Sequence, residues 1–354
     1  MNPSPRRSFA SDNNAPIAPE ILQALLAANA GDAAAYGSDP WTARAIACFK
    51  ECFGDGVEVY FTFNGTGANV AALSSLLQPW EAALTPASAH LQTDECGAFE
   101  RFSGSKVIPI ATADGKLRPA DVAPYLRASP DVHFSQPRAI SISQATEYGG
   151  VYELDELREL CTFAHERGLL VHVDGARLAN AAVALNATLR AASVDAGVDV
   201  LTFGGTKNGL LLGEAICFSH PEQHRGAAAY VQKQSMQLAS KMRYISAQFS
   251  ALLTDDRWRV YAAHANAMAQ LLYQRLHAIA DVRVTRAVRC NVVFATLDGA
   301  AIEHIQREFD FYTFDEALPE VRWMTHWATT PHDVETFAAC IEAAVIATQS
   351  PGRT

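Results

Sequence analysis

A loop near residue 65 has the residue types that bind an anion. Asn64, Gly65, Thr66 and Gly67 follow an apolar segment and precede a helix-like run. Glycines let backbone amides face an anion, a helix N-terminus adds partial positive charge, and Thr66 supplies a hydroxyl. The loop lacks the lysine of a P-loop and the full dinucleotide fingerprint. We interpret it as a phosphate-binding loop, with an ordinary tight turn as the alternative.

A carboxylate follows a second apolar segment, at Asp174 in the run HVDGAR over residues 172–177. Placing a carboxylate at the end of a buried strand is costly unless a cation meets it. A protonated pyridine nitrogen is such a cation. The alternative is that Asp174 caps the helix that follows.

A lysine follows a third segment, at Lys207 in the run TFGGTKN over residues 202–208. The preceding glycines allow a flat ligand to approach the backbone closely. A lysine becomes a nucleophile when its ammonium is partly desolvated or lies near other cations. Most lysines are solvated surface charges, so Lys207 alone would carry little weight.

All three segments follow predicted strands, which must position them. The apolar and β-branched runs predict strands over 57–63, 139–143, 169–173, 198–203 and 215–219. Helical spacing predicts helices over 15–30 and 154–167. This alternation is typical of βαβ units and a mainly parallel sheet, in which functional groups gather at the carboxyl ends of the strands.

The pattern changes near residue 255. A long helix is expected over about 257–279, then two short strands around 282–296, and helices that close the chain. We therefore expect a large α/β domain over 1–254, which includes the N-terminal segment, and a smaller α/β domain over 255–354.

The composition excludes several classes of protein. Hydrophobic residues make up 49% and charged residues 19% of the 354, which is typical of a folded globular chain. A net charge of -10 argues against nucleic acid or an anionic membrane as partner. The seven cysteines are irregularly spaced, and no metal-binding motif is present. No apolar run is long enough for a membrane span or a signal peptide, so we expect a cytoplasmic protein without a required metal.

Together the three loops match the requirements of a pyridoxal 5'-phosphate (PLP) site. A phosphate-binding loop, an aspartate after a buried strand and a lysine after Gly-Gly occur in that order. They would anchor the phosphate, keep the pyridine nitrogen protonated, and hold the aldehyde as a Schiff base on Lys207.

The sequence of these segments resembles that of the threonine aldolase family of the β-eliminating lyase group. The similar segments run from about residue 9 to about 335: SDN, YGSDPWT, GTGAN, AHLQTDECGAFERFSG, HVDGARLAN, TFGGTKNG and VRWMTHW. The resemblance implies the fold of fold-type I PLP enzymes, similar to aspartate aminotransferase. It also implies PLP as cofactor, and cleavage of β-hydroxy-α-amino acids such as threonine or allo-threonine to glycine and an aldehyde.

The resemblance also implies roles for particular residues. Lys207 would carry the cofactor, Asp174 would face its pyridine nitrogen, and Gly65 and Thr66 would hold its phosphate. His90 would stack on the pyridine ring and assist proton transfer.

Three further residues would bind the substrate carboxylate in the same family pattern. Arg177 would lie near both the cofactor and that carboxylate, and Ser11 and Arg322 would complete its binding. A homodimer or homotetramer with sites at subunit interfaces is implied as well.

One position departs from the family pattern. Many threonine aldolases have a second active-site histidine after a threonine, whereas Glu147 follows Thr146 here. The base that takes the β-hydroxyl proton is therefore His90 or, as the second candidate, Glu147. A preference for aromatic substrates such as phenylserine, or a β-elimination instead of an aldol cleavage, stay open as alternatives.

Overall fold

The computed structural model describes residues 7–126, 131–315 and 317–349. Residues 1–6 of the N-terminal segment lie outside the described residues. Residue contacts group the chain into two compact units. The larger unit is Ile17–Arg259, and the smaller unit combines Met1–Pro16 with Val260–Thr354. The domain boundary after residue 254 stays a prediction from the sequence.

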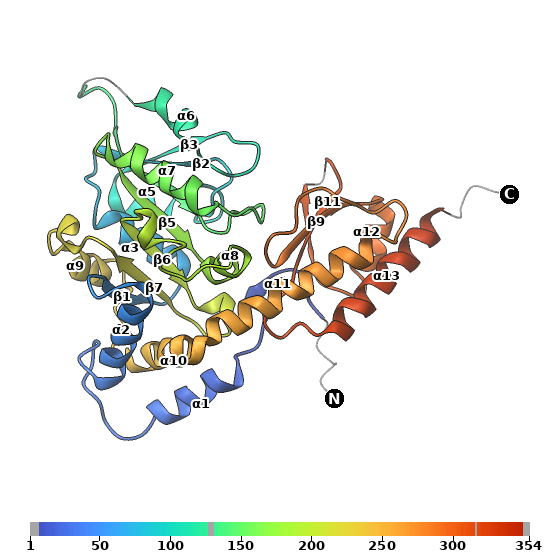
Figure 1. Cartoon of the computed structure of the whole chain (residues 1–354), viewed down its shortest axis with the longest axis horizontal. Helices are drawn as coiled ribbons and strands as arrows, with labels where there is room; N and C mark the ends of the chain where they lie inside the picture. Colours follow the sequence, from blue (N-terminus) through green and yellow to red (C-terminus); the bar gives the residue numbers. More distant parts are fainter. Residues whose placement is uncertain (1–6, 127–130, 316, 350–354) are drawn as a thin grey trace. The chain divides into compact units, whose positions relative to one another are not determined.

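The larger unit contains a seven-stranded sheet in the order β1-β7-β6-β5-β4-β2-β3 (Figure 1). Its strands are β1 (Glu58–Thr62), β2 (Glu81–Pro86), β3 (Lys106–Ile110), β4 (Gln136–Ser143), β5 (Leu170–Gly175), β6 (Val200–Gly204) and β7 (Glu214–Phe218). Strand β7 is antiparallel to both of its neighbours, whereas β6, β5, β4, β2 and β3 pair in parallel. The predicted α/β fold with a mainly parallel sheet is confirmed.

Helices precede, connect and follow these strands. They are α1 (Pro19–Ala28), α2 (Pro40–Phe53), α3 (Gly65–Ser74), α4 (His90–Thr93), α5 (Ala98–Ser103), α6 (Pro119–Val122), α7 (Leu154–His165), α8 (Leu178–Ala184), α9 (Ala227–Gln234) and α10 (Arg243–Leu253). Short 3-10 turns add η2 (Ala123–Tyr125), η3 (Val194–Ala196), η4 (Thr206–Asn208), η5 (Pro221–His224) and η6 (Thr254–Asp256).

Local sequence explains where α7 begins and ends. Glu153 and Glu156 form a capping box at the start of α7. Gly168, with φ +69°, ends the turn after the helix, because this left-handed conformation costs glycine little. All residues of β6 and β7 are buried, as in strands covered on both faces, and apart from Thr202 and Glu214 their sequences are apolar runs.

The smaller unit has a four-stranded antiparallel sheet in the order β10-β11-β9-β8. Its elements are η1 (Asp12–Asn14), α11 (Arg257–Leu276, which begins in the larger unit), β8 (Arg283–Val284), β9 (Val292–Thr296), α12 (Gly299–Ile305), β10 (Tyr312–Asp315), β11 (Glu320–Met324) and α13 (Pro331–Gln349). Aromatic rings form much of its core: Phe9 stacks on Phe337 at 4.1 Å between centroids, and Trp323 meets Phe337 edge-on.

Strands β10 and β11 lie where only helices were expected. Each has four or five residues, too few to show a clear alternation of apolar and polar side chains. Among the described residues, no helix is both long and apolar enough to cross a membrane.

Candidate active site

The loops of the larger unit that contain the predicted site residues lie at one edge of the sheet. Ser143 of β4 pairs with Asp174 of β5, and Asp174 pairs with Thr202 of β6. Because these strands are parallel, their carboxyl ends lie side by side. Lys207 lies in η4, three residues after β6 ends. Its ammonium lies close enough to Asp174 and His90 to affect the pKa of both, so the structure brings these three predicted residues together.

The predicted phosphate-binding loop is the N-terminus of α3. Asn64 caps the helix, because its side-chain oxygen accepts a hydrogen bond from the Gly67 amide at 2.8 Å. The amides of Gly65 and Thr66 also belong to the first turn, where a helix has no backbone acceptors for them. A Cβ added to Gly65 would meet no described atom within 4 Å. The turn therefore has room at Gly65, whereas at Gly67 the Gln237 side chain packs closely against it.

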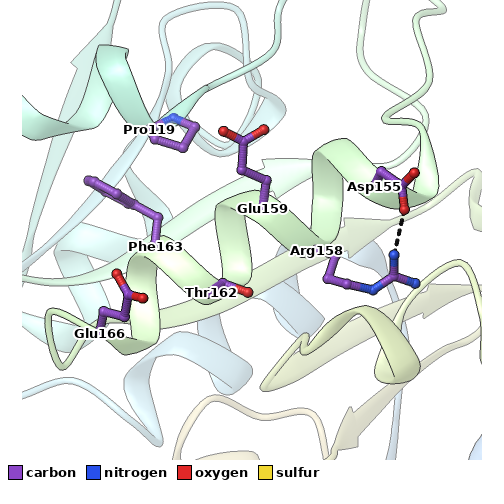
Figure 2. Close-up of a pocket in the computed structure, with 7 residues that line it drawn as sticks. All are labelled: Pro119, Asp155, Arg158, Glu159, Thr162, Phe163 and Glu166. Atoms are coloured by element: carbon purple, nitrogen blue, oxygen red, sulfur yellow. Dashed lines mark hydrogen bonds and ion pairs between the residues drawn. The ribbon is translucent and has the colours of Figure 1, made fainter.

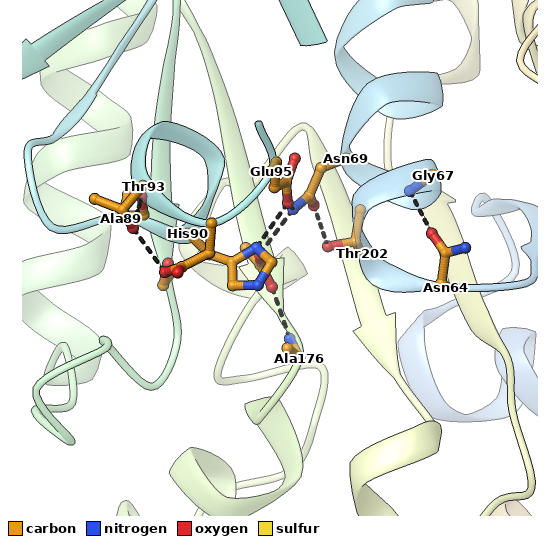
Figure 3. A network of polar contacts seen from close by, with 12 residues as sticks. Asn64, Gly67, Asn69, Ala89, His90, Thr93, Glu95, Ala176 and Thr202 are labelled. Carbon is orange, nitrogen blue, oxygen red and sulfur yellow. Dashed lines mark hydrogen bonds and ion pairs between the residues drawn. The ribbon is translucent and has the colours of Figure 1, made fainter. Parts of the chain in front are cut away.

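A polar network lies beside this loop, and Figure 3 shows it from close by. The Asn69 amide nitrogen donates to Asp174 Oδ2 at 2.8 Å and to Glu95 Oε1 at 2.8 Å. The Thr202 hydroxyl donates to Asn69 Oδ1 at 3.0 Å. We call Asn69, His90, Glu95, Asp174 and Thr202 the Asn69 network. It ties helix α3 to the ends of β5 and β6.

His90 is oriented by a buried carboxylate. Its Nδ1 lies 2.9 Å from Glu95 Oε1, and the Glu95 side chain is fully buried whereas the His90 side chain is 38% exposed. The hydrogen bond to Glu95 raises the pKa of His90; burial and the Lys207 ammonium oppose that shift, and Asp174 adds to it. Because the carboxylate accepts a hydrogen bond from Nδ1, the other ring nitrogen, Nε2, is left to exchange a proton with a ligand.

Asp174 stays ionised although it lies at the end of a buried strand. Burial acts to raise the pKa of its carboxyl. The hydrogen bonds from Asn69 and from the Ala176 amide at 2.9 Å, with the positive charge of Lys207, outweigh burial, and the pKa is lowered. A carboxylate held in this way can pair with a cationic ring nitrogen. In contrast, burial lowers the pKa of His172 to about 4, so this histidine is a neutral packing group.

The Glu147 carboxyl binds the backbone of His90. Its Oε1 accepts hydrogen bonds from the His90 amide at 2.9 Å and from the Ser143 hydroxyl at 2.6 Å. Its Oε2 is buried and has no hydrogen-bond partner within the described part of the chain. Burial raises the pKa of this carboxyl. With Oε1 used as a double acceptor, the proton of the neutral acid belongs on Oε2.

The predicted carboxylate-binding residues are divided between the two units. Arg177 is half-buried at the start of α8, two residues after β5 ends. Ser11 and Arg322 belong to the smaller unit. Ser11 caps η1, where its hydroxyl accepts from the Asn13 amide, and an Arg322 guanidinium nitrogen lies 3.5 Å from the carbonyl of Ala10. The structure therefore places Ser11 and Arg322 near each other.

Two other features have residue types that could form a site. Ligating atoms of His90, Glu95 and Asp174 lie within 4.8 Å of one another. The Asn69 amide donates to both carboxylates, however, and a cation between them would repel those hydrogens. A pocket on the outer face of α7 is lined by Pro119, Asp155, Arg158, Glu159, Thr162, Phe163 and Glu166 (Figure 2). It contains none of the predicted site residues.

Sequence reasoning overlooked three residues of the site. Asn69, Glu95 and Thr202 stand inside the segments GTGAN, TDECGAF and TFGGTKN, but no role was assigned to them. A polar residue at a position that helical or strand spacing predicts to be buried was the available signal. Asn69 and Glu95 are 1% and 4% exposed, so each needs a polar partner.

The sequence is similar to proteins of known family. The family model described as beta-eliminating lyase matches residues 8–299, more than half of the chain. A low specificity L-threonine aldolase of a Pseudomonas strain is 43% identical over 96% of this chain and 99% of its own length. The enzyme of the same description from Pseudomonas aeruginosa is 43% identical over 91% of this chain and 93% of its own.

Solved structures agree with this relationship. The threonine aldolase of Leishmania major superposes with a TM-score of 0.90 at 31% identity, over 96% of this chain and 99% of that one. Aspartate aminotransferase from Thermus thermophilus superposes with a TM-score of 0.67 at 15% identity, over 95% and 90%, which shows a shared fold alone. The chain thus belongs to the beta-eliminating lyase family, and within that family to the threonine aldolases.

Proposed function

We propose that this protein is a low specificity L-threonine aldolase whose cofactor, PLP, is bound covalently by Lys207. The reaction cleaves threonine or allo-threonine to glycine and an aldehyde. The observation that carries the proposal is the meeting of Lys207, the ionised Asp174 and the N-terminus of α3 at one edge of the sheet. When bound, PLP supplies an aldehyde that links to amines and a ring that accepts electrons from the bond that breaks.

The described residues fit this cofactor. The amides of Gly65 and Thr66 and the Thr66 hydroxyl are suited to its phosphate, since they lie in the first turn of α3, where a helix has no backbone acceptors for its amides. Asp174 is suited to the ring nitrogen, because its neighbours keep it charged. His90, whose ring is partly exposed, is suited to cover one face of the ring.

The substrate carboxylate needs cationic donors. We assign Arg177 and Arg322 to it, because a guanidinium group binds a carboxylate through two parallel hydrogen bonds and so fixes its orientation. Ser11 adds a hydroxyl donor. These assignments rest on the matching family segments, and replacing Arg322 by lysine tests them: it should raise KM for threonine much more than it lowers kcat.

The β-hydroxyl proton needs an acceptor. His90 is the first candidate, because Glu95 holds its Nδ1 proton and leaves Nε2 as the basic atom. Glu147 is the second. Burial raises its pKa, which increases the proton affinity of the carboxylate, and its Oε2 has no hydrogen-bond partner among the described residues. His90→Phe keeps an aromatic ring and removes the base, so loss of activity in this variant supports His90. Retained activity there, with loss in Glu147→Gln, would transfer the role to Glu147.

Lys207→Ala tests the central assignment. The purified wild-type protein, supplied with PLP, should be yellow, and borohydride followed by peptide mass mapping should place the label on Lys207. The alanine variant should show neither the label nor turnover. Turnover at the wild-type rate in that variant would refute the assignment.

Product analysis separates the reactions that this fold supports. Threonine, allo-threonine and phenylserine should each give glycine and the corresponding aldehyde. Formation of a keto acid and ammonia from serine or threonine would instead indicate β-elimination. We also propose a homodimer or homotetramer, which sedimentation can test, and location in the cytoplasm stays a prediction from the sequence.

A further inference from the structure

A buried carboxyl group, that of Glu214, contacts the backbone of the loop that contains Lys207, and no role has been assigned to it above. Glu214 is the first residue of β7 and is 7% exposed. In the sheet it pairs with Gly204, the last residue of β6. Residues 204–214, which we call the Glu214 loop, thus leave the sheet at Gly204, pass through Lys207 and return at Glu214.

The carboxyl of Glu214 binds the polypeptide just before the lysine. Its Oε2 accepts a hydrogen bond from the Gly205 amide at 3.1 Å, and the Thr206 side chain, whose hydroxyl lies 3.4 Å from the Gly213 carbonyl oxygen, also favours the ionised carboxyl. The Gly213 amide in turn donates to the Thr206 hydroxyl at 3.1 Å. Glu214 thus holds Gly205 and the Gly213 backbone holds Thr206, so the two residues that precede Lys207 are both fixed from inside the loop.

Close packing leaves these residues little freedom. A Cβ on Gly205 would lie 2.4 Å from Leu210 and 2.8 Å from the Gly213 carbonyl oxygen. A Cβ on Gly204 would lie 2.3 Å from the Ala176 carbonyl oxygen. A loop confined in this way transmits a change at Glu214 to the base of the lysine side chain.

Two charged groups face Glu214. The Lys207 ammonium favours its ionised form and the Asp174 carboxylate opposes it. Burial is the largest influence and raises the pKa of Glu214 to about 7. The carboxyl therefore changes charge near neutral pH, close to the amine that would carry the cofactor.

We propose that Glu214 is a positioning residue for Lys207: its carboxyl fixes the Gly205–Thr206 backbone, and its negative charge stabilises positive charge on the lysine nitrogen. This inference rests on the proposed function, since it assumes that Lys207 carries the cofactor. Glu214 does not need to touch substrate or cofactor to act in this way.

The test is a spectroscopic pH titration of the cofactor-loaded protein. The absorbance of the bound cofactor reports the protonation of the lysine nitrogen in its link to the cofactor. Glu214→Gln keeps an acceptor for the Gly205 amide but cannot become negative. We expect its titration midpoint to move to lower pH by about one pH unit, because an adjacent anion stabilises the protonated nitrogen.

Two further variants make the result specific. Glu58→Gln changes a carboxyl on the neighbouring strand β1 that binds His224 and Tyr60, and it should leave the midpoint unchanged. Thr206→Val removes a donor that favours ionised Glu214, so it should shift the midpoint in the same direction as Glu214→Gln but by less. If Glu214→Gln does not fold, Thr206→Val decides the question.

The outcomes are distinct. An unchanged midpoint in the Glu214→Gln and Thr206→Val variants, or an equal shift in Glu58→Gln, overturns the role of Glu214. A wild-type protein that forms no chromophore with PLP overturns the proposed function instead.

Discussion

Two regions at the same edge of the sheet contain a buried or half-buried carboxyl group, and they treat it in opposite ways. In the Asn69 network, Asp174 receives hydrogen bonds from Asn69 and from the Ala176 amide, and its pKa is lowered. In the Glu214 loop, burial dominates over the donors Gly205 and Thr206, and the pKa of Glu214 is raised to about 7.

The difference shows that burial alone does not decide the charge of a carboxyl group. Lys207 favours the ionised form of both Asp174 and Glu214, so it does not separate them. What separates them is the remaining charged neighbour: His90 also acts to lower the pKa of Asp174, whereas the Asp174 carboxylate acts to raise the pKa of Glu214. The site thus combines one permanent anion with one that titrates near neutral pH.

The largest expected effect comes from removing the permanent charge. Asp174→Asn should lower kcat by about 10²- to 10³-fold with the cofactor still bound, because the ring nitrogen loses its anionic partner. Steady-state kinetics with threonine measure kcat, and the cofactor absorbance shows whether the cofactor is still bound. Asp155→Asn, a 95% exposed carboxylate on α7, is the matched control and should change neither. A tenfold loss or less would mean that Asp174 is not the essential anion.

The next largest effect is expected from removing hydrogen-bond donors of the Asn69 network. Asn69→Ala removes one hydrogen bond from Asp174 and one from Glu95, and should lower kcat/KM by about 10- to 100-fold, the range for hydrogen bonds to charged groups. Thr202→Val removes only the bond that orients Asn69, so its effect should be smaller. The reverse order of these two variants would show that Asn69 does not act by donating to the carboxylates.

The parts of this comparison that could be predicted from the sequence are those that follow strands. Asp174 and Lys207 stand directly after apolar runs, and the rule on carboxyl ends of parallel strands places them together. Asn69 meets Asp174 across 105 residues of sequence, and its place within a helix gives no local sign of that contact. Glu214 is hidden in the same way, because it reads as the edge of an apolar strand and its partners depend on how the loop folds back.

A smaller effect is expected for the charge on His90. Glu95 raises the pKa of His90, and a base must be unprotonated, so kcat/KM should fall as the pH falls through that pKa. Glu95→Gln removes the negative partner and lowers the pKa. The acidic limb of log(kcat/KM) against pH should therefore move to lower pH, by about one pH unit. An acidic limb that stays in place would indicate a base other than His90, and Glu147 would be the next to test.

The smallest effect concerns stability, and it sharpens the contrast between the two carboxyls. The ordinary pKa of Glu214 is 4.5 and the folded value is about 7, so between these pH values the folded chain keeps a proton that the unfolded chain has lost. Stability should then fall as the pH rises through this window, by at most about 1.4 kcal/mol per pH unit. Glu214→Gln should lack this decline, which urea unfolding at pH 5, 6 and 7, at fixed protein and cofactor concentration, would measure.

Asp174 has the opposite linkage, because its lowered pKa contributes stability that is lost only as the pH falls below its ordinary value of 3.8. Parallel stability curves for wild type and Glu214→Gln from pH 5 to 7 would mean that Glu214 is ionised throughout, and the contrast with Asp174 would disappear.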